Sequence, residues 1–263
     1  VEALEARLRD LAQGMASGRP PTARIRMLYS IPNFQNPSGI TLAAERRPRV
    51  LELAEAYGFF VVEDDVYRDL VYGGEVPASL FALDSGASRS GLGRHVLRIG
   101  SFSKILAPGL RLGWLLGPED KIEGLLNSGL RSMGGGANPL VANSLAEYCQ
   151  QGLLEPHVDL LCRIYQQRRD VMLAALRDCM PRTVQWTEPG GGYFIWLTLP
   201  KPLCAADVVE QASKKGVIML GGDPFFAEEP TGQHLRLAFS YVTPDKIREG
   251  IEILGHVVRS ALD

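Results

Sequence analysis

Hydrophobic residues recur at two different spacings along the chain, and the spacing changes from helical to strand-like several times. Apolar positions three or four residues apart predict an amphipathic helix over residues 2–16. A second helix is expected over residues 42–57, ending at Gly58, because glycine readily takes the left-handed conformation that stops a helix. Short, mostly apolar runs predict strands at 27–31, 59–62, 95–99 and 112–116.

The first half of the chain alternates strands with helices, which is typical of an α/β domain with right-handed crossovers. The run Phe59–Val62 is apolar throughout and too short for a helix, so we expect a strand buried on both faces, as in parallel sheets. Two further helices are predicted over residues 118–132 and 139–150. We assign residues 1–152 to part of a large, mostly parallel α/β domain.

The second half has a different pattern, in which one long helix precedes short strands and two helices. The long helix is predicted over residues 153–180. Strands follow at 184–186, 193–197, 217–220 and 235–239, and helices at 205–215 and 244–261. We therefore expect residues 153–263 to form a connecting helix and a small α+β domain.

Composition excludes several classes of protein. The 263 residues carry a net charge of −2, without the basic excess of nucleic-acid binders, and no apolar run is long enough to span a membrane. The four cysteines lack paired spacing, which favours reduced thiols in a cytoplasmic protein, and the four histidines lack metal-ligand spacing. Val1–Leu4 has neither an initiator Met nor the apolar stretch of a signal peptide, so we expect further chain before it.

The segment Ser101–Trp114 (SFSKILAPGLRLGW) contains the most distinctive chemistry of the sequence. Two hydroxyls, Ser101 and Ser103, flank Lys104 after an apolar strand. Arg111 follows seven residues after the lysine. A lysine that forms a Schiff base with a phosphate-bearing aldehyde needs such a set: a fixed amine, hydroxyl donors for an anion and a fork-shaped cation. The alternative is an ordinary surface lysine after a strand.

Three consecutive acids, Glu63, Asp64 and Asp65, follow the apolar run, and Tyr67 comes shortly after them. A carboxylate at the carboxyl end of a buried parallel strand lies where ligands bind in open α/β sheets. The pattern does not choose among the three acids, and a solvated acidic loop is the alternative.

Two more polar residues lie in unusual surroundings. Asn36 begins the sequence Asn-Pro-Ser-Gly, which taken alone is typical of an ordinary turn. Arg236 lies between apolar residues on a predicted inner strand, where a charge is costly unless it is paired. A structural salt bridge is the alternative to a ligand-binding role for this arginine.

Together these spaced motifs resemble those of pyridoxal-phosphate (PLP) aminotransferases of fold type I, class I/II, from about Ile25 to the end of the chain. The resemblance implies the fold type I architecture, with an incomplete large domain and a small C-terminal domain. It assigns Lys104 as the Schiff-base lysine whose freed amine moves the substrate Cα proton. It also selects Asp64, because the family's aspartate lies three residues before its tyrosine, here Tyr67. That aspartate keeps the pyridine nitrogen of PLP protonated.

The resemblance implies contacts for the remaining residues. Tyr67 and Asn36 would hydrogen-bond the phenolate oxygen of PLP. The phosphate would be bound by two hydroxyls and a guanidinium: Ser101, Ser103 and Arg111. The Ser103 side chain should point away from its neighbours if the preceding strand continues through it. Arg236 and Asn36 are the expected substrate-binding residues, and Arg236 would bind the α-carboxylate through two parallel hydrogen bonds.

Two glycine clusters are interpreted through the same resemblance. Pro189–Trp196 is similar to a family segment that lines the substrate side, whereas the glycines alone are also typical of a plain hairpin turn. Gly134–Asn138 follows a predicted helix, not a strand, which argues against a dinucleotide-binding loop. Near this position the family has a loop that reaches the active site of the partner subunit.

Tyr29–Pro37 and Glu63–Tyr67 most resemble the 2-aminoadipate and kynurenine aminotransferase group, which includes the effector domains of MocR-type bacterial regulators. The implied activity moves an amino group from an amino acid to a 2-oxo acid, most often 2-oxoglutarate. A regulatory PLP-binding domain, or a PLP lyase or decarboxylase, is an alternative on the same fold. The resemblance also implies a homodimer, and a preceding region that supplies the rest of the cofactor site.

Overall fold

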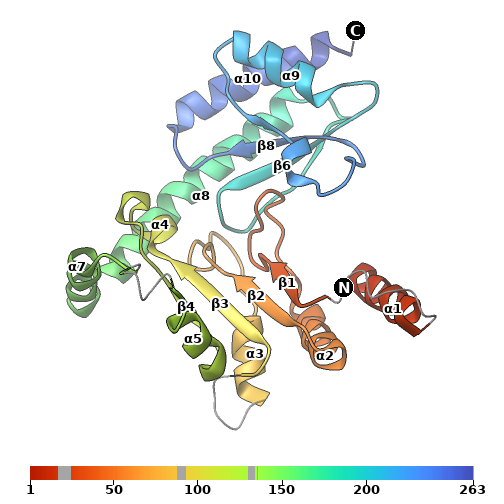
Figure 1. Ribbon diagram of the computed structural model, residues 1–263. Coiled ribbons are helices and arrows are strands. Elements are labelled where there is room, and N and C mark those ends of the chain that lie inside the picture. The colour runs from red at the N-terminus through yellow and green to blue at the C-terminus, as the bar shows by residue number, and fades with distance from the viewer. Residues whose placement is uncertain (17–24, 88–92, 130–133, 135, 263) are drawn as a thin grey trace. The chain divides into compact units, whose positions relative to one another are not determined.

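The computed structural model describes residues 1–16, 25–87, 93–129, 134 and 136–262 (Figure 1). The sequence Gly-Arg-Pro-Pro at 18–21, which is expected to end the first helix, lies outside the described residues. So do the last residues of the helix predicted over 118–132, and Gly135. The chain divides into two compact units. Unit 1 comprises Val1–Pro32, Leu42–Val66 and Val76–Leu154, and unit 2 comprises Asn33–Thr41, Tyr67–Glu75 and Glu155–Asp263. Two short segments of the first half therefore group with the second half.

Unit 1 is built on a four-stranded sheet with the order β1-β2-β3-β4. Its strands are β1 (Met27–Ser30), β2 (Phe60–Asp64), β3 (Val96–Ser101) and β4 (Gly113–Leu116). Its helices are α1 (Glu2–Ala16), α2 (Arg47–Tyr57), α3 (Leu80–Ala87), α4 (Phe102–Ile105), α5 (Glu119–Leu126) and α7 (Pro139–Gln150), with 3-10 turns η1 (Ala44–Arg46) and η2 (Pro108–Leu110). The pairs β1–β2 and β2–β3 are parallel, as expected, whereas β3–β4 is antiparallel. Residues 102–112 are too short a connection for a parallel crossover.

Helices α1 and α7 of unit 1 match their predicted ranges, whereas other helices differ from the prediction. The helix predicted over 42–57 begins as the turn η1 and ends at Gly58, whose φ of +66° gives the predicted left-handed stop. The helix predicted from residue 118 ends early, at Leu126. Helix α3 is not predicted by the pattern, because its short sequence contains Asp, Ser and Gly, which favour helices weakly.

The sheet of unit 1 buries one face more completely than the other. Val61 and Val96 are fully buried and belong to a core that includes side chains of α1, α2 and α3. On the opposite face, Phe60 and Val62 are only half-buried. The prediction that this strand is buried on both faces is therefore wrong for the chain as described, since the three helices of the core all contribute to one face.

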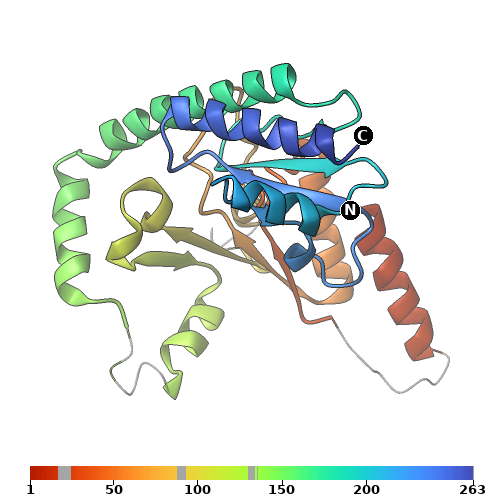
Figure 2. The ribbon, with the colours of Figure 1, turned by 90° about the horizontal axis from the view of Figure 1, so that it is seen from above.

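Unit 2 contains a four-stranded antiparallel sheet with the order β5-β6-β8-β7. Its strands are β5 (Gln185–Trp186), β6 (Phe194–Leu199), β7 (Leu220–Gly221) and β8 (Gln233–Ala238). Its helices are α8 (Leu154–Cys179), α9 (Ala205–Lys214) and α10 (Pro244–Ser260), with the 3-10 turn η3 (Asp223–Phe225). The long predicted helix is a single helix of 26 residues, and Figure 2 shows it beside α10.

The two faces of the unit 2 sheet have different chemistry. Ile195 lies opposite Leu237 across the β6–β8 pair, and both are buried in the core. Trp196 lies opposite Arg236 in the same register. Because side chains alternate along a strand, Trp196 and Arg236 share the face opposite to that core. The sheet therefore holds Arg236 on its polar and aromatic face.

Candidate active site

The segment around Lys104 folds so that its hydroxyls and its arginine converge. Strand β3 ends at Ser101, whose Oγ accepts a hydrogen bond of 3.1 Å from the Ser103 backbone N–H. Arg111 has a left-handed backbone (φ +51°), and its Nη1 donates to Ser103 Oγ at 3.5 Å and to the Pro108 carbonyl at 3.2 Å. Strand β3 stops before Ser103, so the condition under which the Ser103 side chain would point away from its neighbours is not met.

Close packing at the end of β3 fixes the starting point of the short helix that contains Lys104. Gly100 pairs with Trp114 of β4, and a Cβ on Gly100 would overlap the Trp114 indole. The Phe102 ring lies 4.9 Å from that indole, centroid to centroid. Helix α4, which contains Lys104, starts from this anchored point, and the Lys104 side chain is partly buried.

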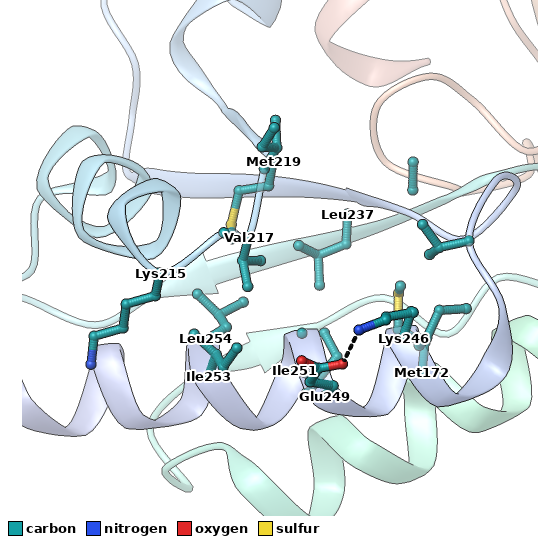
Figure 3. Close-up of a pocket in the computed structure, with 16 residues that line it drawn as sticks. Met172, Lys215, Val217, Met219, Leu237, Lys246, Glu249, Ile251, Ile253 and Leu254 are labelled. Carbon is teal, nitrogen blue, oxygen red and sulfur yellow. Dashed lines mark hydrogen bonds and ion pairs between the residues drawn. The ribbon is translucent and has the colours of Figure 1, made fainter.

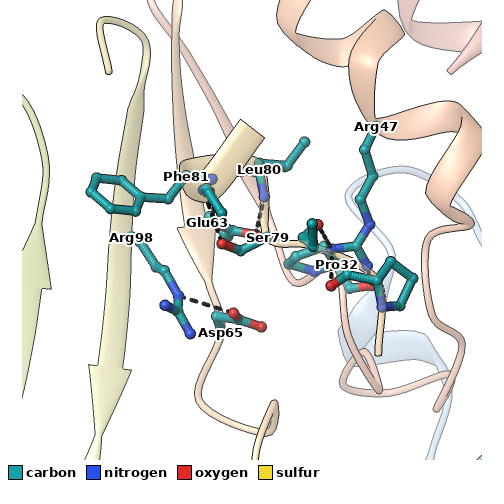
Figure 4. Close-up of polar contacts among 11 residues, drawn as sticks. Pro32, Arg47, Glu63, Asp65, Ser79, Leu80, Phe81 and Arg98 are labelled. Atoms are coloured by element: carbon teal, nitrogen blue, oxygen red, sulfur yellow. Dashed lines mark hydrogen bonds and ion pairs between the residues drawn. The ribbon is translucent and has the colours of Figure 1, made fainter. Parts of the chain in front are cut away.

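Two of the three acids after the apolar run are occupied by structural contacts (Figure 4). The Glu63 carboxylate is fully buried and accepts hydrogen bonds from the backbone N–H groups of Leu80 at 2.8 Å and Phe81 at 2.9 Å, at the start of α3. Burial raises the pKa of Glu63. Asp65 Oδ2 pairs with Arg98 Nε at 3.0 Å. These two acids therefore brace strand β2 against its neighbours.

Asp64 lies on the other side of β2, because side chains alternate along a strand. Its Oδ2 accepts a hydrogen bond from the Tyr29 hydroxyl of β1. Its Oδ1 is buried and has no hydrogen-bond partner among the described residues. Of the three acids, Asp64 is thus the one with a buried carboxylate oxygen left for a ligand, and a buried carboxylate needs a donor or a cation.

Two residues of this region were not predicted from the sequence. Tyr29 pairs in register with Val62, which places it on the Asp64 side of the sheet. Arg47 is 1% exposed and donates to the carbonyl oxygens of Leu42 at 3.0 Å and Ala78 at 2.9 Å (Figure 4). It holds the loops beside α2 and α3 in place. Tyr29 is identified only by the strand register of the folded chain, and nothing in the local sequence marks Arg47.

Arg236 of unit 2 has polar and aromatic neighbours. Its Nη1 donates to Asn36 Oδ1 at 2.8 Å, and its Nε is buried without a hydrogen-bond partner among the described residues. The guanidinium carbon lies 4.3 Å from the Phe194 ring centroid and 4.9 Å from that of Phe225. Burial lowers the pKa of Arg236. Within the described chain it forms no salt bridge with an acidic side chain, so the structural ion pair is not what holds it.

Tyr67 also lies in unit 2, in an aromatic setting. Its side chain is 4% exposed, and its ring meets those of Tyr193 at 5.4 Å and Phe194 at 6.0 Å, both edge to face. Gly39, three residues after Asn36, has φ +69°, and a Cβ there would lie 2.6 Å from the Phe194 carbonyl oxygen. The loop that contains Asn36 therefore packs closely against the start of β6.

The glycine cluster before β6 is a packing surface for the segment that follows Tyr67. Tyr72 N–H donates to the Gly190 carbonyl at 2.7 Å, and Gly192 N–H donates to the Leu70 carbonyl at 3.0 Å. In the second cluster, Asn138 caps α7 by accepting from the Leu140 N–H at 3.0 Å. Close backbone approach accounts for the glycines of the first cluster.

The predicted site residues are shared between the units. Unit 1 contains Asp64, Ser101, Ser103, Lys104 and Arg111, and unit 2 contains Asn36, Tyr67 and Arg236. The described residues include no cluster of His, Cys, Asp and Glu that could hold a metal ion, and no helix among them could cross a membrane. All four cysteines are unpaired.

Unit 2 also has a cavity of about 360 Å³ that contains none of these residues (Figure 3). Its walls are largely apolar side chains, including Val217, Met219 and Leu254. At its edge Lys246 pairs with Glu249 at 2.6 Å. The cavity lies between α10 and the segment before β7, and it offers no group suited to the chemistry described above.

Comparison with known proteins identifies the family. Residues 1–254 match the family described as Aminotransferase class I and II. The chain belongs to the class I and II aminotransferases. This aminotransferase chain is 38% identical over its whole length to aromatic-amino-acid aminotransferase 1 of Thermococcus litoralis, of which it covers 59%. It is also 31% identical, over 89% of its length, to the HTH-type transcriptional regulator YdfD of Bacillus subtilis, of which it covers 46%.

A solved relative supports the same fold and cofactor. Kynurenine aminotransferase from Pyrococcus horikoshii, solved with PMP, matches all of this aminotransferase chain with a TM-score of 0.88 and 37% identity, and the chain covers 61% of it. The fold is that of fold type I PLP aminotransferases, and the cofactor is pyridoxal phosphate. The chain spans about three-fifths of the length of these aminotransferases.

Proposed function

We propose that the protein containing this chain is a PLP-dependent aminotransferase that moves an amino group from an amino acid to a 2-oxo acid, with 2-oxoglutarate as the expected acceptor. One observation carries the proposal. In the described chain, four buried side-chain polar atoms lack a partner, and two of them are Asp64 Oδ1 and Arg236 Nε. Buried polar groups are normally hydrogen-bonded, and these two belong to residues of the expected site, so they support ligand binding there. One would serve the cofactor and the other the substrate.

The residues present fit PLP. When bound, PLP supplies an aldehyde carbon and a ring that withdraws electrons from the reacting carbon. Asp64 Oδ1 would accept the hydrogen bond of the ring N–H, and the negative charge of Asp64 would keep that proton in place. The phosphate would be held by the converging donors of the lysine segment: Ser101, Ser103 and Arg111. Lys104 would hold the cofactor covalently and then carry the proton to and from the substrate Cα.

Arg236 and Asn36 would act together on the substrate side. Arg236 Nε and its neighbouring N–H groups can bind an α-carboxylate through two parallel hydrogen bonds. Because Asn36 Oδ1 already accepts from Arg236, its amide N–H₂ is left to donate, and the phenolate oxygen of PLP is the acceptor we propose. Tyr67 would be the second donor to that oxygen.

The activity is tested by half-reactions of the full-length protein loaded with PLP. The donors are L-phenylalanine, L-kynurenine, L-2-aminoadipate and L-leucine, each added without a 2-oxo acid. We expect at least one to convert the cofactor absorbance to that of PMP, and 2-oxoglutarate to reverse the change. Release of carbon dioxide or of an unsaturated product without formation of PMP would favour a decarboxylase or lyase. No change with any donor would contradict the proposal.

A regulatory domain is the second candidate, because the match to the regulator YdfD covers most of this chain. Such a protein would bind PLP and an amine ligand without turnover. A winged helix-turn-helix segment preceding this chain, together with sequence-specific DNA binding, would support it.

We also propose a cytoplasmic homodimer. Exposed apolar side chains on α5 and α7 support association, since Leu125, Leu126 and Leu140 are 52%, 45% and 76% exposed. The unpaired cysteines agree with a reducing compartment. Light scattering of the PLP-loaded protein tests the assembly, and an active monomer would overturn it.

A further inference from the structure

We propose that Phe225 is a positioning residue that holds the Arg236 guanidinium ready for a carboxylate, with Phe194 as its partner. This inference rests on the proposed function of Arg236. Phe225 lies outside the sequence motifs described above. Phe225 ends the turn η3, in the loop between β7 and β8.

The contacts of Arg236 are of a kind that leaves its charge available. Phe194 and Phe225 present their rings to the guanidinium at 4.3 and 4.9 Å. An aromatic face attracts a cation without neutralising it. The Asn36 amide oxygen is likewise uncharged. A carboxylate in the same place would orient the arginine equally well, but it would compete with the substrate. An anion-binding arginine is therefore best fixed by such neutral contacts.

The loop that contains Phe225 is itself anchored. The Phe225 ring meets the Trp196 indole edge to face at 5.8 Å, and that indole stacks on His234 at 5.1 Å. Gly222 N–H donates to the His234 carbonyl at 2.8 Å, and a Cβ on Gly222 would lie 2.6 Å from the His234 Cβ. The start of the loop is thus pinned to β8, on the face of the sheet that carries Arg236.

The neighbouring Phe226 provides a matched control. Its ring stacks on His234 at 5.6 Å and lies tilted against Trp196 at 6.5 Å. The guanidinium of Arg236 has its ring contacts with Phe194 and Phe225 in the described chain. Loss of the Phe226 ring would therefore disturb the same loop without touching the guanidinium.

The experiment uses the full-length protein loaded with PLP. Two ligands are compared: the amino acid that reacts fastest in the half-reactions above, and the α-carboxamide of that amino acid, which lacks the carboxylate. Apparent Kd and maximal rate are measured for wild type, Phe225→Leu, Phe225→Met, Phe225→Tyr and Phe226→Leu. We expect the Leu and Met variants at position 225 to raise the apparent Kd of the amino acid about 2- to 30-fold. Their maximal rate and the Kd of the carboxamide should change little. Phe225→Tyr keeps the aromatic ring, so it should bind the amino acid about as tightly as wild type. Phe226→Leu should also resemble wild type.

Two results would overturn the proposal. One is an unchanged ratio of the amino acid Kd to the carboxamide Kd in both Phe225→Leu and Phe225→Met. The other is an equal change of this ratio in Phe226→Leu. Arg236→Gln separates this failure from failure of the proposed function. If Arg236→Gln weakens binding of the amino acid and Phe225→Leu does not, only the proposed role of Phe225 is wrong. The proposed function of Arg236 fails if Arg236→Gln leaves the Kd of the amino acid unchanged, or if no donor reacts. The proposed role of Phe225 then fails as well.

Discussion

Arg236 Nη1 donates a hydrogen bond of 2.8 Å to Asn36 Oδ1, across 200 positions of sequence. This bond joins the loop before Gly39 to strand β8, and it fixes which end of the Asn36 amide accepts. The remaining amide N–H₂ then faces away from the guanidinium as a donor. The arginine that we propose to bind substrate and the asparagine that we propose to bind the cofactor are therefore coupled by one hydrogen bond within unit 2.

Asn36→Ala tests this coupling. The change removes a hydrogen bond to a charged group, which is worth about 1.5–3 kcal/mol. We expect kcat/KM for the best amino donor to fall roughly 10- to 100-fold, in keeping with that free energy. Gln35→Ala, at the exposed neighbouring position, is the control and should stay within a few-fold of wild type. Equal losses in both variants would indicate that the loop, not the Asn36 amide, matters.

Asp64→Asn and Asp65→Asn separate the two aspartates by function. Asp64→Asn removes the charge we propose to hold the ring proton of PLP, so turnover should fall by orders of magnitude while the cofactor still binds. Asp65→Asn weakens the pairing with Arg98, so the free energy of unfolding should drop by about 1–3 kcal/mol with turnover largely kept. Steady-state kinetics and urea unfolding measure the two effects. The reverse pattern would mean that Asp65 is the cofactor's aspartate.

The sequence pattern predicts most of this architecture because the signals are local. Apolar spacing locates the strands, and Gly58 marks the end of α2. Local signals do not choose among Glu63, Asp64 and Asp65, because they do not show which side of β2 is covered by structural contacts. Strand alternation and the contacts of α3 and Arg98 separate them, and both require the folded chain.

Residues that act through tertiary contacts could not be predicted from the sequence. Tyr29 reaches Asp64 through strand pairing, and Phe225 reaches Arg236 through a loop anchored on His234. The orientation of Ser103 likewise depends on where β3 stops. For Tyr29 and Phe225 the deciding interaction joins two segments that are separate in the sequence.

Glu63→Gln tests the role of the buried carboxylate in stability. Burial raises the pKa of Glu63 in the folded state above its ordinary value of 4.5. The stabilisation from the neutral form is therefore fully present below about pH 4.5 and is lost as the pH rises through the folded-state pKa. The Gln side chain does not ionise, so the variant does not lose this stabilisation as the pH rises. Its single oxygen leaves one backbone N–H of α3 unsatisfied, at a cost of about 1–3 kcal/mol.

Glu63→Gln should consequently be less stable than wild type near pH 4.5. The difference in the free energy of unfolding between the two proteins should become smaller toward pH 8. Urea unfolding of both proteins across this pH range measures the difference. A gap that widens as the pH rises would contradict the assigned direction of the pKa shift.

Identifying the lysine to which PLP is covalently attached tests the proposed role of Lys104 most directly. The full-length protein loaded with PLP is reduced with borohydride, digested and analysed by mass spectrometry. We expect the reduced cofactor on the peptide containing Lys104, and we expect Lys104→Ala to show neither this label nor turnover. A label on any other lysine, or full turnover in Lys104→Ala, would contradict this role.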